Sequence, residues 1–213
     1  SAFETFFQEK RPFFIEGQNI FEFGHGGANN GWGFDFGVPE LLYSRRIGRK
    51  PQGNIDYDYD YMDKPTETRI LSAGKLTGKT KNILSVGVLS AVTERTFAII
   101  DTGDGMIKQE VEPLTHYGVF RSKKEFNNSR QSLGMIFTSV NRDLNDSLLN
   151  NQLAKDAYIF GVDGWTFLDK EKVWVLTGNV IGSYIYGTKE YMLDFQESPF
   201  RYLQRPDAKE FTL

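Results

Sequence analysis

Carboxylates and tyrosines alternate in the stretch from Ile55 to Asp63, IDYDYDYMD. If this stretch is extended, its side chains alternate between two sides of the chain. Three carboxylates on one side could hold Ca²⁺ through their oxygens, although the glycine and the closing glutamate of a standard calcium loop are missing. The tyrosines on the other side could stack on sugar rings or anchor a loop at a membrane interface. The predicted cation ligands are Asp56, Asp58 and Asp60, and the predicted ligand-binding tyrosines are Tyr57, Tyr59 and Tyr61.

A glycine-rich stretch, FGHGGANNGWGFDFG, covers residues 23–37 and contains Trp32. It could cradle a ligand against Trp32, and the alternatives are a flexible loop or a segment that fills a lumen. Glu16 lies beside Phe13 and Phe14, a setting that could suit acid catalysis, but no second carboxylate is tied to it by spacing. The sequence therefore assigns no catalytic residue and favours a non-enzymatic role.

The stretch AGKLTGKT, residues 73–80, matches the loosest form of the phosphate-binding loop. Such a loop needs a helix that starts at the Gly-Lys-Thr, because the phosphates bind free N–H groups at that helix's N-terminus. Residues 69–79 and 82–93 both alternate with period two instead, which predicts two antiparallel strands joined at Thr80-Lys81-Asn82. We therefore predict a hairpin here and no nucleotide site.

Composition limits the classes of function. The 25 Lys and Arg residues against 28 Asp and Glu residues give no basic field, so nucleic acid is not an expected partner. There is no cysteine, and the two histidines make a multi-histidine metal centre an improbable choice. Apart from the Ca²⁺ considered above, we expect no cofactor. A basic cluster, YSRRIGRK, could meet anionic lipid headgroups or form a solvated turn; its cations are Arg45, Arg46, Arg49 and Lys50.

The elements that would position these groups are long strands. The hairpin at 69–93 is followed by two more, with strands at 114–126 and 130–141 around Asn127-Asn128-Ser129, and at 156–168 and 173–186 around Lys170-Glu171-Lys172. Long connections separate the hairpins at 94–113, 142–155 and 187–199, and Asp143 to Ala154 could form a short helix. The sequence predicts an all-β fold, an antiparallel up-and-down meander with tight turns at one end and long loops at the other.

Strand length distinguishes two all-β classes. Soluble strands average about 5–6 residues, whereas a tilted membrane strand needs about 9–11. Strands of 11–14 residues with dyad alternation therefore favour part of a transmembrane β-barrel, and the alternative is a soluble sandwich or barrel with long strands. Six or seven strands cannot close a barrel whose minimum is eight. We expect a fragment, with a Gly/aromatic-rich plug, lumen or loop segment at 1–68 and a partial outer-membrane barrel at 69–213.

The last hairpin tests this prediction through its register. A two-residue turn would place Asp163 on the face of Trp165, Trp174 and Val180, where a carboxylate is costly in lipid. A three-residue turn at 170–172 pairs Phe160 with Gly182 on one face and Asp163 with Asn179 on the other. This register separates apolar from polar residues, and we predict it.

Several short segments of the sequence resemble one family. They are FFQEKRPFFIEG (6–17), YSRRIGRKPQ (43–52), ILSAGKLTGKT (70–80), EPLTHYGVFRSKKEFNN (112–128), FTSVNRD (137–143) and FRYLQRPDA (200–208). Together they resemble an uncharacterised family of Gram-negative bacterial proteins, in which a family-9-like carbohydrate-binding module precedes a region predicted to be an outer-membrane β-barrel. The resemblance implies no catalytic residues, and the binding module itself is absent from these residues.

The predicted function is that of an outer-membrane β-barrel protein of a Gram-negative bacterium, for passage or surface binding of a solute such as a saccharide. Its expected partners are outer-membrane lipid, that solute and the remaining strands of the same barrel. The alternative is a soluble β-domain of a carbohydrate-active or carbohydrate-binding protein, with acid residues from the first 65 in its site.

Overall fold

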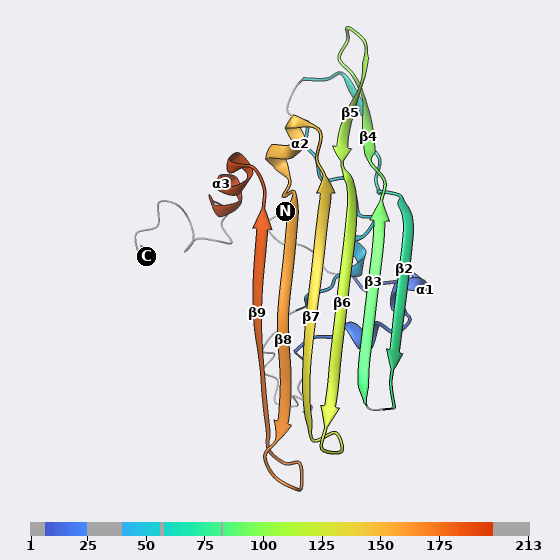
Figure 1. The fold of residues 1–213 in the computed structure, drawn as a ribbon. Coiled ribbons are helices and arrows are strands. Elements are labelled where there is room, and N and C mark those ends of the chain that lie inside the picture. Colours follow the sequence, from blue (N-terminus) through green and yellow to red (C-terminus); the bar gives the residue numbers. More distant parts are fainter. Residues whose placement is uncertain (1–6, 25–39, 56–57, 82, 198–213) are drawn as a thin grey trace.

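A computed structural model describes residues 7–24, 40–55, 58–81 and 83–197 (Figure 1). Its largest feature is a six-stranded antiparallel sheet in the order β2-β3-β6-β7-β8-β9. The strands are β2 (Ile70–Lys79), β3 (Leu84–Thr93), β6 (Leu114–Phe126), β7 (Gln131–Asp143), β8 (Asp156–Phe167) and β9 (Val175–Tyr186). Every neighbour pair is antiparallel. The predicted all-β meander is therefore confirmed.

The three predicted hairpins are present, with their tight turns at the same end of the sheet (Figure 1). In the last one, Phe160 pairs with Gly182, Val162 with Val180 and Asp163 with Asn179. The Leu168 N–H also donates to the Trp174 carbonyl at 3.0 Å. The predicted register is confirmed, and Asp163 lies on the face opposite Trp174.

The middle hairpin turns through residues that tolerate a left-handed backbone. Asn127, Asn128 and Ser129 have φ values of 50°, 54° and 57°. Asparagine enters this region more readily than most residues. The local sequence therefore places this turn, and Phe126 pairs with Gln131 directly beyond it.

Two of the predicted connections are more structured than the sequence indicated. Residues 94–113 are not a plain loop: they form β4 (Thr96–Asp101) and β5 (Met106–Glu112), which join β1 (Tyr61–Asp63) in a three-stranded sheet. The last connection forms α3 (Lys189–Glu197). The short helix expected between Asp143 and Ala154 is confirmed as α2 (Ser147–Gln152), whose N-cap Asp146 accepts from the Leu148 N–H at 2.8 Å. These additions lie at the end opposite the tight turns (Figure 1).

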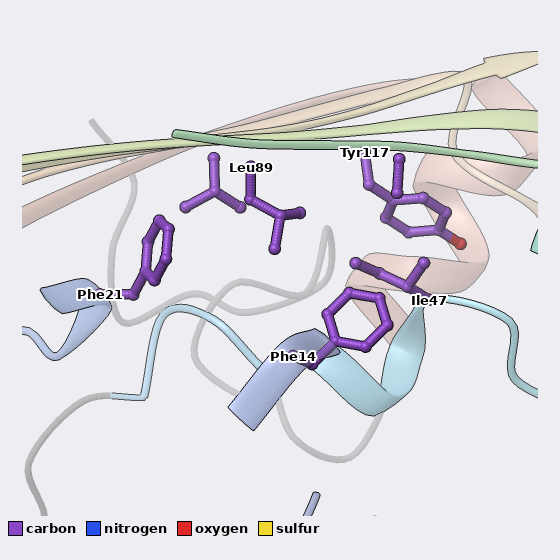
Figure 2. Packing of buried hydrophobic residues seen from close by; sticks show 7 residues of the cluster. Phe14, Phe21, Ile47, Leu89 and Tyr117 are labelled. Carbon is purple, nitrogen blue, oxygen red and sulfur yellow. The ribbon is translucent and has the colours of Figure 1, made fainter. Parts of the chain in front are cut away.

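The described residues of the N-terminal segment, 7–24 and 40–55, form a layer on one face of the six-stranded sheet, which we call the N-terminal layer. It contains α1 (Pro12–Ile15) and two 3₁₀ turns, η1 (Gln18–Phe21) and η2 (Ser44–Arg46). Figure 2 shows Phe14, Phe21 and Ile47 directed toward Leu89 and Tyr117 of the sheet. The largest core cluster of the described residues lies in this layer, and it is completed by Ala91 and Val119. We call this side the covered face and the opposite side the open face.

The six-stranded sheet does not close on itself within the described residues. Its edges are β2 and β9, which do not pair with each other. Most residues of β9 are exposed on both sides of the strand, as are most residues of β2. The barrel expected from the sequence is therefore not formed by the described strands alone.

Candidate functional site

The open face carries a continuous row of apolar side chains across five neighbouring strands. The register places them side by side, and Gly182 of β9 ends the row. All five side chains are large, apolar and exposed; they are Leu76, Val88, Phe120, Phe137 and Phe160. The next row toward the turns continues the pattern with Met135 and Val180, the latter 76% exposed. Exposed apolar surface of this extent marks an interaction site.

Charges on the open face are confined to the strand ends. By parity, the charged positions that share this face are Lys124 near the turns and Asp143 and Asp156 near the loops. Aromatic rings lie toward the same two borders. Tyr158 stacks at 6.1 Å from Phe137 and at 6.5 Å from Tyr184, and Trp174 is exposed beside the turn. The result is an uncharged band between two aromatic borders.

The covered face holds a buried ion pair at its centre. Arg121 of β6 donates from two guanidinium nitrogens to the two carboxylate oxygens of Asp163 on β8, at 2.6 and 2.8 Å. Arg121 is 1% exposed and Asp163 is 7% exposed. The Gly24 N–H adds a third hydrogen bond to Asp163, at 3.0 Å. A bidentate, charge-assisted pair of this kind offsets part of the cost of removing both charges from water.

This pair fits because β7 carries a glycine between its two partners. Gly134 pairs with Asp163, and a Cβ added at Gly134 would lie 2.7 Å from an Asp163 oxygen and 2.8 Å from an Arg121 nitrogen. The Arg121 guanidinium also lies 5.4 Å from the centre of the Phe23 ring. The ion pair therefore ties three strands to the N-terminal layer. Among the described residues, the Arg121 Nε has no hydrogen-bond partner.

A second polar cluster lies where the covered face meets the loops. Glu112 is 1% exposed and accepts from the Gln52 N–H at 2.8 Å. Burial raises the pKa of Glu112, against the opposing effects of this hydrogen bond and of Arg49 and Arg142. Burial also lowers the pKa of Arg49, which donates to the Gln52 side chain. Glu112 and its two arginines thus form a buried charge cluster that links β5 to the N-terminal layer.

The predicted ligand-binding tyrosines lie next to the small sheet. Tyr61 begins β1 and pairs with Asp101 of β4, and Tyr59 lies two residues earlier; both rings are exposed. Trp32 and Tyr57 lie outside the described residues. The structure therefore brings Tyr59 and Tyr61 to the loop end and leaves the other two predictions open.

The predicted Ca²⁺ ligands are only partly described. Asp58 and Asp60 are exposed, and the Asp60 N–H donates to the Asp101 carbonyl at 2.8 Å. Asp56 lies outside the described residues. Within the described part of the chain, no group of three or more His, Cys, Asp or Glu side chains is arranged to hold a metal ion.

The phosphate-loop match lies on a strand. Gly74 and Gly78 share one face of β2, as predicted, and Lys79 ends the strand beside the turn. Lys79 lies 3.6 Å from a Glu125 oxygen of the neighbouring hairpin. The predicted hairpin is confirmed, and the N–H groups of this stretch belong to a sheet.

The sequence showed half of the buried ion pair. Register reasoning placed Asp163 on the polar side of its hairpin, but its partner Arg121 lies 42 residues earlier. Arg121 lies in Phe-Arg-Ser-Lys-Lys, where it resembles the other basic residues near the turns. The available signal was parity, since Arg121 lies two and four residues after Val119 and Tyr117 and therefore shares the covered face with them. Glu112 and its arginines were missed because residues 94–113 were interpreted as a loop.

None of the helices in the described ranges is long and apolar enough to cross a membrane. A family model described as a domain of unknown function (DUF5916) matches residues 1–198. No curated protein and no solved structure matches the chain.

Proposed function

The chain belongs to this family of unknown function (DUF5916), and we propose that it forms part of the wall of an outer-membrane β-barrel in a Gram-negative bacterium. The observation that carries the proposal is the open face. Its central row is apolar and exposed on five neighbouring strands, and the rows on either side of it carry no charge. A sheet face with this composition is matched by lipid, because an outer-membrane barrel presents an apolar band flanked by aromatic girdles.

The height of the uncharged band on the open face also supports a barrel wall. Trp174 and Tyr184 lie ten residues apart on the last hairpin, on the same face. Ten residues of strand span about 33 Å, and a tilt of about 40° reduces this to about 25 Å of height, which is the height of a barrel's apolar band. The aromatic side chains would then lie at the two membrane interfaces.

The sheet edges support further strands as partners. β9 extends over 12 residues and is exposed along its length, and β2 extends over 10. A long exposed edge with an apolar face is prone to pair with another chain. In the proposal, both edges pair with the remaining strands of the same barrel, which also satisfies backbone groups that lipid could not.

The covered face would then face the lumen, and the N-terminal layer packed against its core cluster would form a plug or lining. In this arrangement the protein serves passage or surface binding of a solute. A saccharide suits the exposed Tyr59 and Tyr61 at the loop end, because tyrosine rings stack on sugars.

The decisive experiment compares two neighbouring residues of β9. The chain has no cysteine, so single-cysteine variants are unambiguous. Val180 lies on the open face and Asn179 on the other, and both are exposed. In native membranes, Val180→Cys should resist a membrane-impermeant maleimide and Asn179→Cys should react. A soluble domain in detergent-free buffer would react with the maleimide at both positions. Equal reaction of the two variants in native membranes would contradict the proposal.

The alternative function is that of a soluble β-domain from a carbohydrate-active or carbohydrate-binding protein. The exposure of Tyr59 and Tyr61 favours it as much as it favours the barrel. Partitioning separates the two: a barrel protein requires detergent and changes its gel mobility on heating, whereas a soluble domain does neither.

A further inference from the structure

We propose that the N-terminal layer contains a binding site for a phosphate-bearing anion, formed between residues 7–11 and 43–50. The two segments enclose a pocket of about 630 Å³. Its lining includes six cationic side chains, Lys10, Arg11, Arg45, Arg46, Arg49 and Lys50. This proposal does not rest on membrane insertion, so it stands or fails separately from the proposed function.

The walls of this pocket are held by a defined network. Arg11 donates to both oxygens of Glu9, at 3.0 and 2.7 Å, and to the Ile47 and Ser44 carbonyls, at 2.8 and 2.9 Å. The Ser44 hydroxyl donates to Glu9 at 2.6 Å. The Phe7 N–H donates to the Tyr43 hydroxyl at 2.8 Å. These contacts pin one segment on the other, so the pocket exists before a ligand arrives.

The same network pairs the Glu9 carboxylate of the pocket with a cation. The Arg11 hydrogen bonds, aided by the Ser44 hydroxyl, outweigh the effect of burial and lower the pKa of Glu9 to about 2. Glu9 and Arg11 therefore neutralise each other. Of the other cationic side chains in the described lining, Lys10, Arg45 and Lys50 are exposed or partly exposed at the pocket, and the lining has one further carboxylate, Glu67.

Positive charge is crowded around this site. The pKa of Lys64 is lowered mainly by burial and next by the charge of Lys50. The pKa of Arg49 is likewise lowered by burial first; Tyr117 and Glu112 raise it, and the charges of Arg142 and Arg46 lower it further. Several cations around one pocket match the charge of a phosphate group better than that of one carboxylate, because phosphate offers more acceptor oxygens and more negative charge.

The size of the pocket indicates a ligand larger than a lone phosphate ion. Sites for small organic ligands occupy about 300–1,000 Å³. A sugar phosphate or the headgroup of an anionic lipid would fill this space, and both present the same phosphate chemistry. Lys10 and Lys50 are exposed at the pocket, and Arg45 is partly exposed, with one nitrogen donating to the Gln8 carbonyl at 3.0 Å. These three side chains are the proposed contacts.

The test is a calorimetric titration of the full chain with pyrophosphate and with glucose 6-phosphate. We expect saturable binding that weakens as salt rises, since salt screens exposed charges. Arg45→Gln should weaken binding about tenfold, the value of one charge-assisted hydrogen bond. Lys10→Gln and Lys50→Gln should each weaken it severalfold. Lys172→Gln is the matched control, because Lys172 is exposed like Lys10 and Lys50 but lies in the turn after β8.

A second arm distinguishes the source of the phosphate. Vesicles of phosphatidylcholine are compared with vesicles that also contain phosphatidylglycerol. If the soluble phosphates bind and Arg45→Gln weakens this binding, the site is for a solute. If only the phosphatidylglycerol vesicles bind and the same variant weakens that binding, the site is for a lipid headgroup. Binding of neither probe, or an equal loss with Lys172→Gln, would overturn the proposal. Circular dichroism of each variant establishes that the fold is retained.

Discussion

Phe160 and Gly161 are neighbours on β8 and lie on opposite faces of the sheet. The Phe160 ring is 51% exposed on the open face. Gly161 lies under the N-terminal layer, where an added Cβ would be 2.7 Å from the Phe23 ring. The same alternation thus leaves a large apolar side chain uncovered and places the smallest residue under a tightly packed layer, the reverse of what a sheet face in water requires.

The polar residues of the two faces differ in the same sense. Charges are absent from the central rows of the open face, whereas the covered face buries Arg121 against Asp163. A charge is stable away from water only when it is paired. The covered face therefore holds charged groups by pairing them, and the central rows of the open face carry none. This difference is expected if the open face meets lipid, where pairing partners are scarce.

The largest effect should come from breaking the buried pair. Asp163→Leu leaves Arg121 charged and unpaired, and we expect it to lower the free energy of unfolding by about 3–5 kcal/mol. Urea denaturation measures the loss. Adding Arg121→Met should restore most of the stability, because two apolar residues need no partner. A double variant as unstable as the single one would show that the pair acts through packing and not through charge.

A charge on the open face tests the other half of the comparison. Phe160→Arg should cost about 2–4 kcal/mol in a membrane, and Thr166→Arg, close to the turns on the same face, about 0–1 kcal/mol. Folding titrations into lipid vesicles measure both values. If the open face is in water, the two substitutions should be equally harmless, since surface changes stay within about 0.5 kcal/mol.

Acid should loosen the layer on the covered face. The pKa of Glu9 is lowered from 4.5 to about 2, chiefly by the Arg11 hydrogen bonds. A lowered carboxylate pKa stabilises the fold above the unfolded value, and this stabilisation is lost as pH falls from about 4.5 to about 2. The loss should be on the order of 2 kcal/mol. Urea denaturation at a series of pH values across this range measures the free energy of unfolding. Its dependence on pH should be weaker in Glu9→Gln, and an unchanged pH dependence in that variant would assign the acid sensitivity to another group.

A pair of glycines gives the smallest effect. Gly161→Ala should cost about 1 kcal/mol or more, because its Cβ meets Phe23, while Gly182→Ala on the open face has nothing within 4 Å and should change stability by less than about 0.5 kcal/mol. Urea denaturation and protease cleavage before residue 24 report on both variants. Equal sensitivity of the two would mean that the N-terminal layer does not press on the sheet.

Local patterns were sufficient to predict the large sheet. Alternation marked its six strands, and Asn127-Asn128-Ser129 marked a turn because asparagine tolerates a left-handed backbone. Asp163 decided the register of the last hairpin, because only one register keeps its carboxylate away from the apolar residues. The hairpin of β4 and β5 escaped prediction, since its strands are short and Glu110 and Glu112 interrupt the apolar pattern at its end.

The candidate sites depended more on contacts between distant residues. Tyr59 and Tyr61 could be singled out from the sequence, because they alternate with carboxylates, and their role as ligand-binding residues stays a prediction. The Arg121–Asp163 pair and the basic pocket were not, because each unites segments more than 30 residues apart. The cations from Arg45 to Lys50 had been interpreted as a headgroup site or a solvated turn. Their enclosure by residues 7–11 is visible only in the folded chain.

By itself, the sequence determined where the six strands of the large sheet run, how their hairpins turn and which of their side chains share a face, because these depend on alternation and on local backbone preference. Only the tertiary structure decided which face is covered, which arginine neutralises Asp163 and where the N-terminal basic residues gather. These outcomes depend on burial and on the pairing of charges between distant segments. Both contribute to stability only after the chain has folded and brought these segments together.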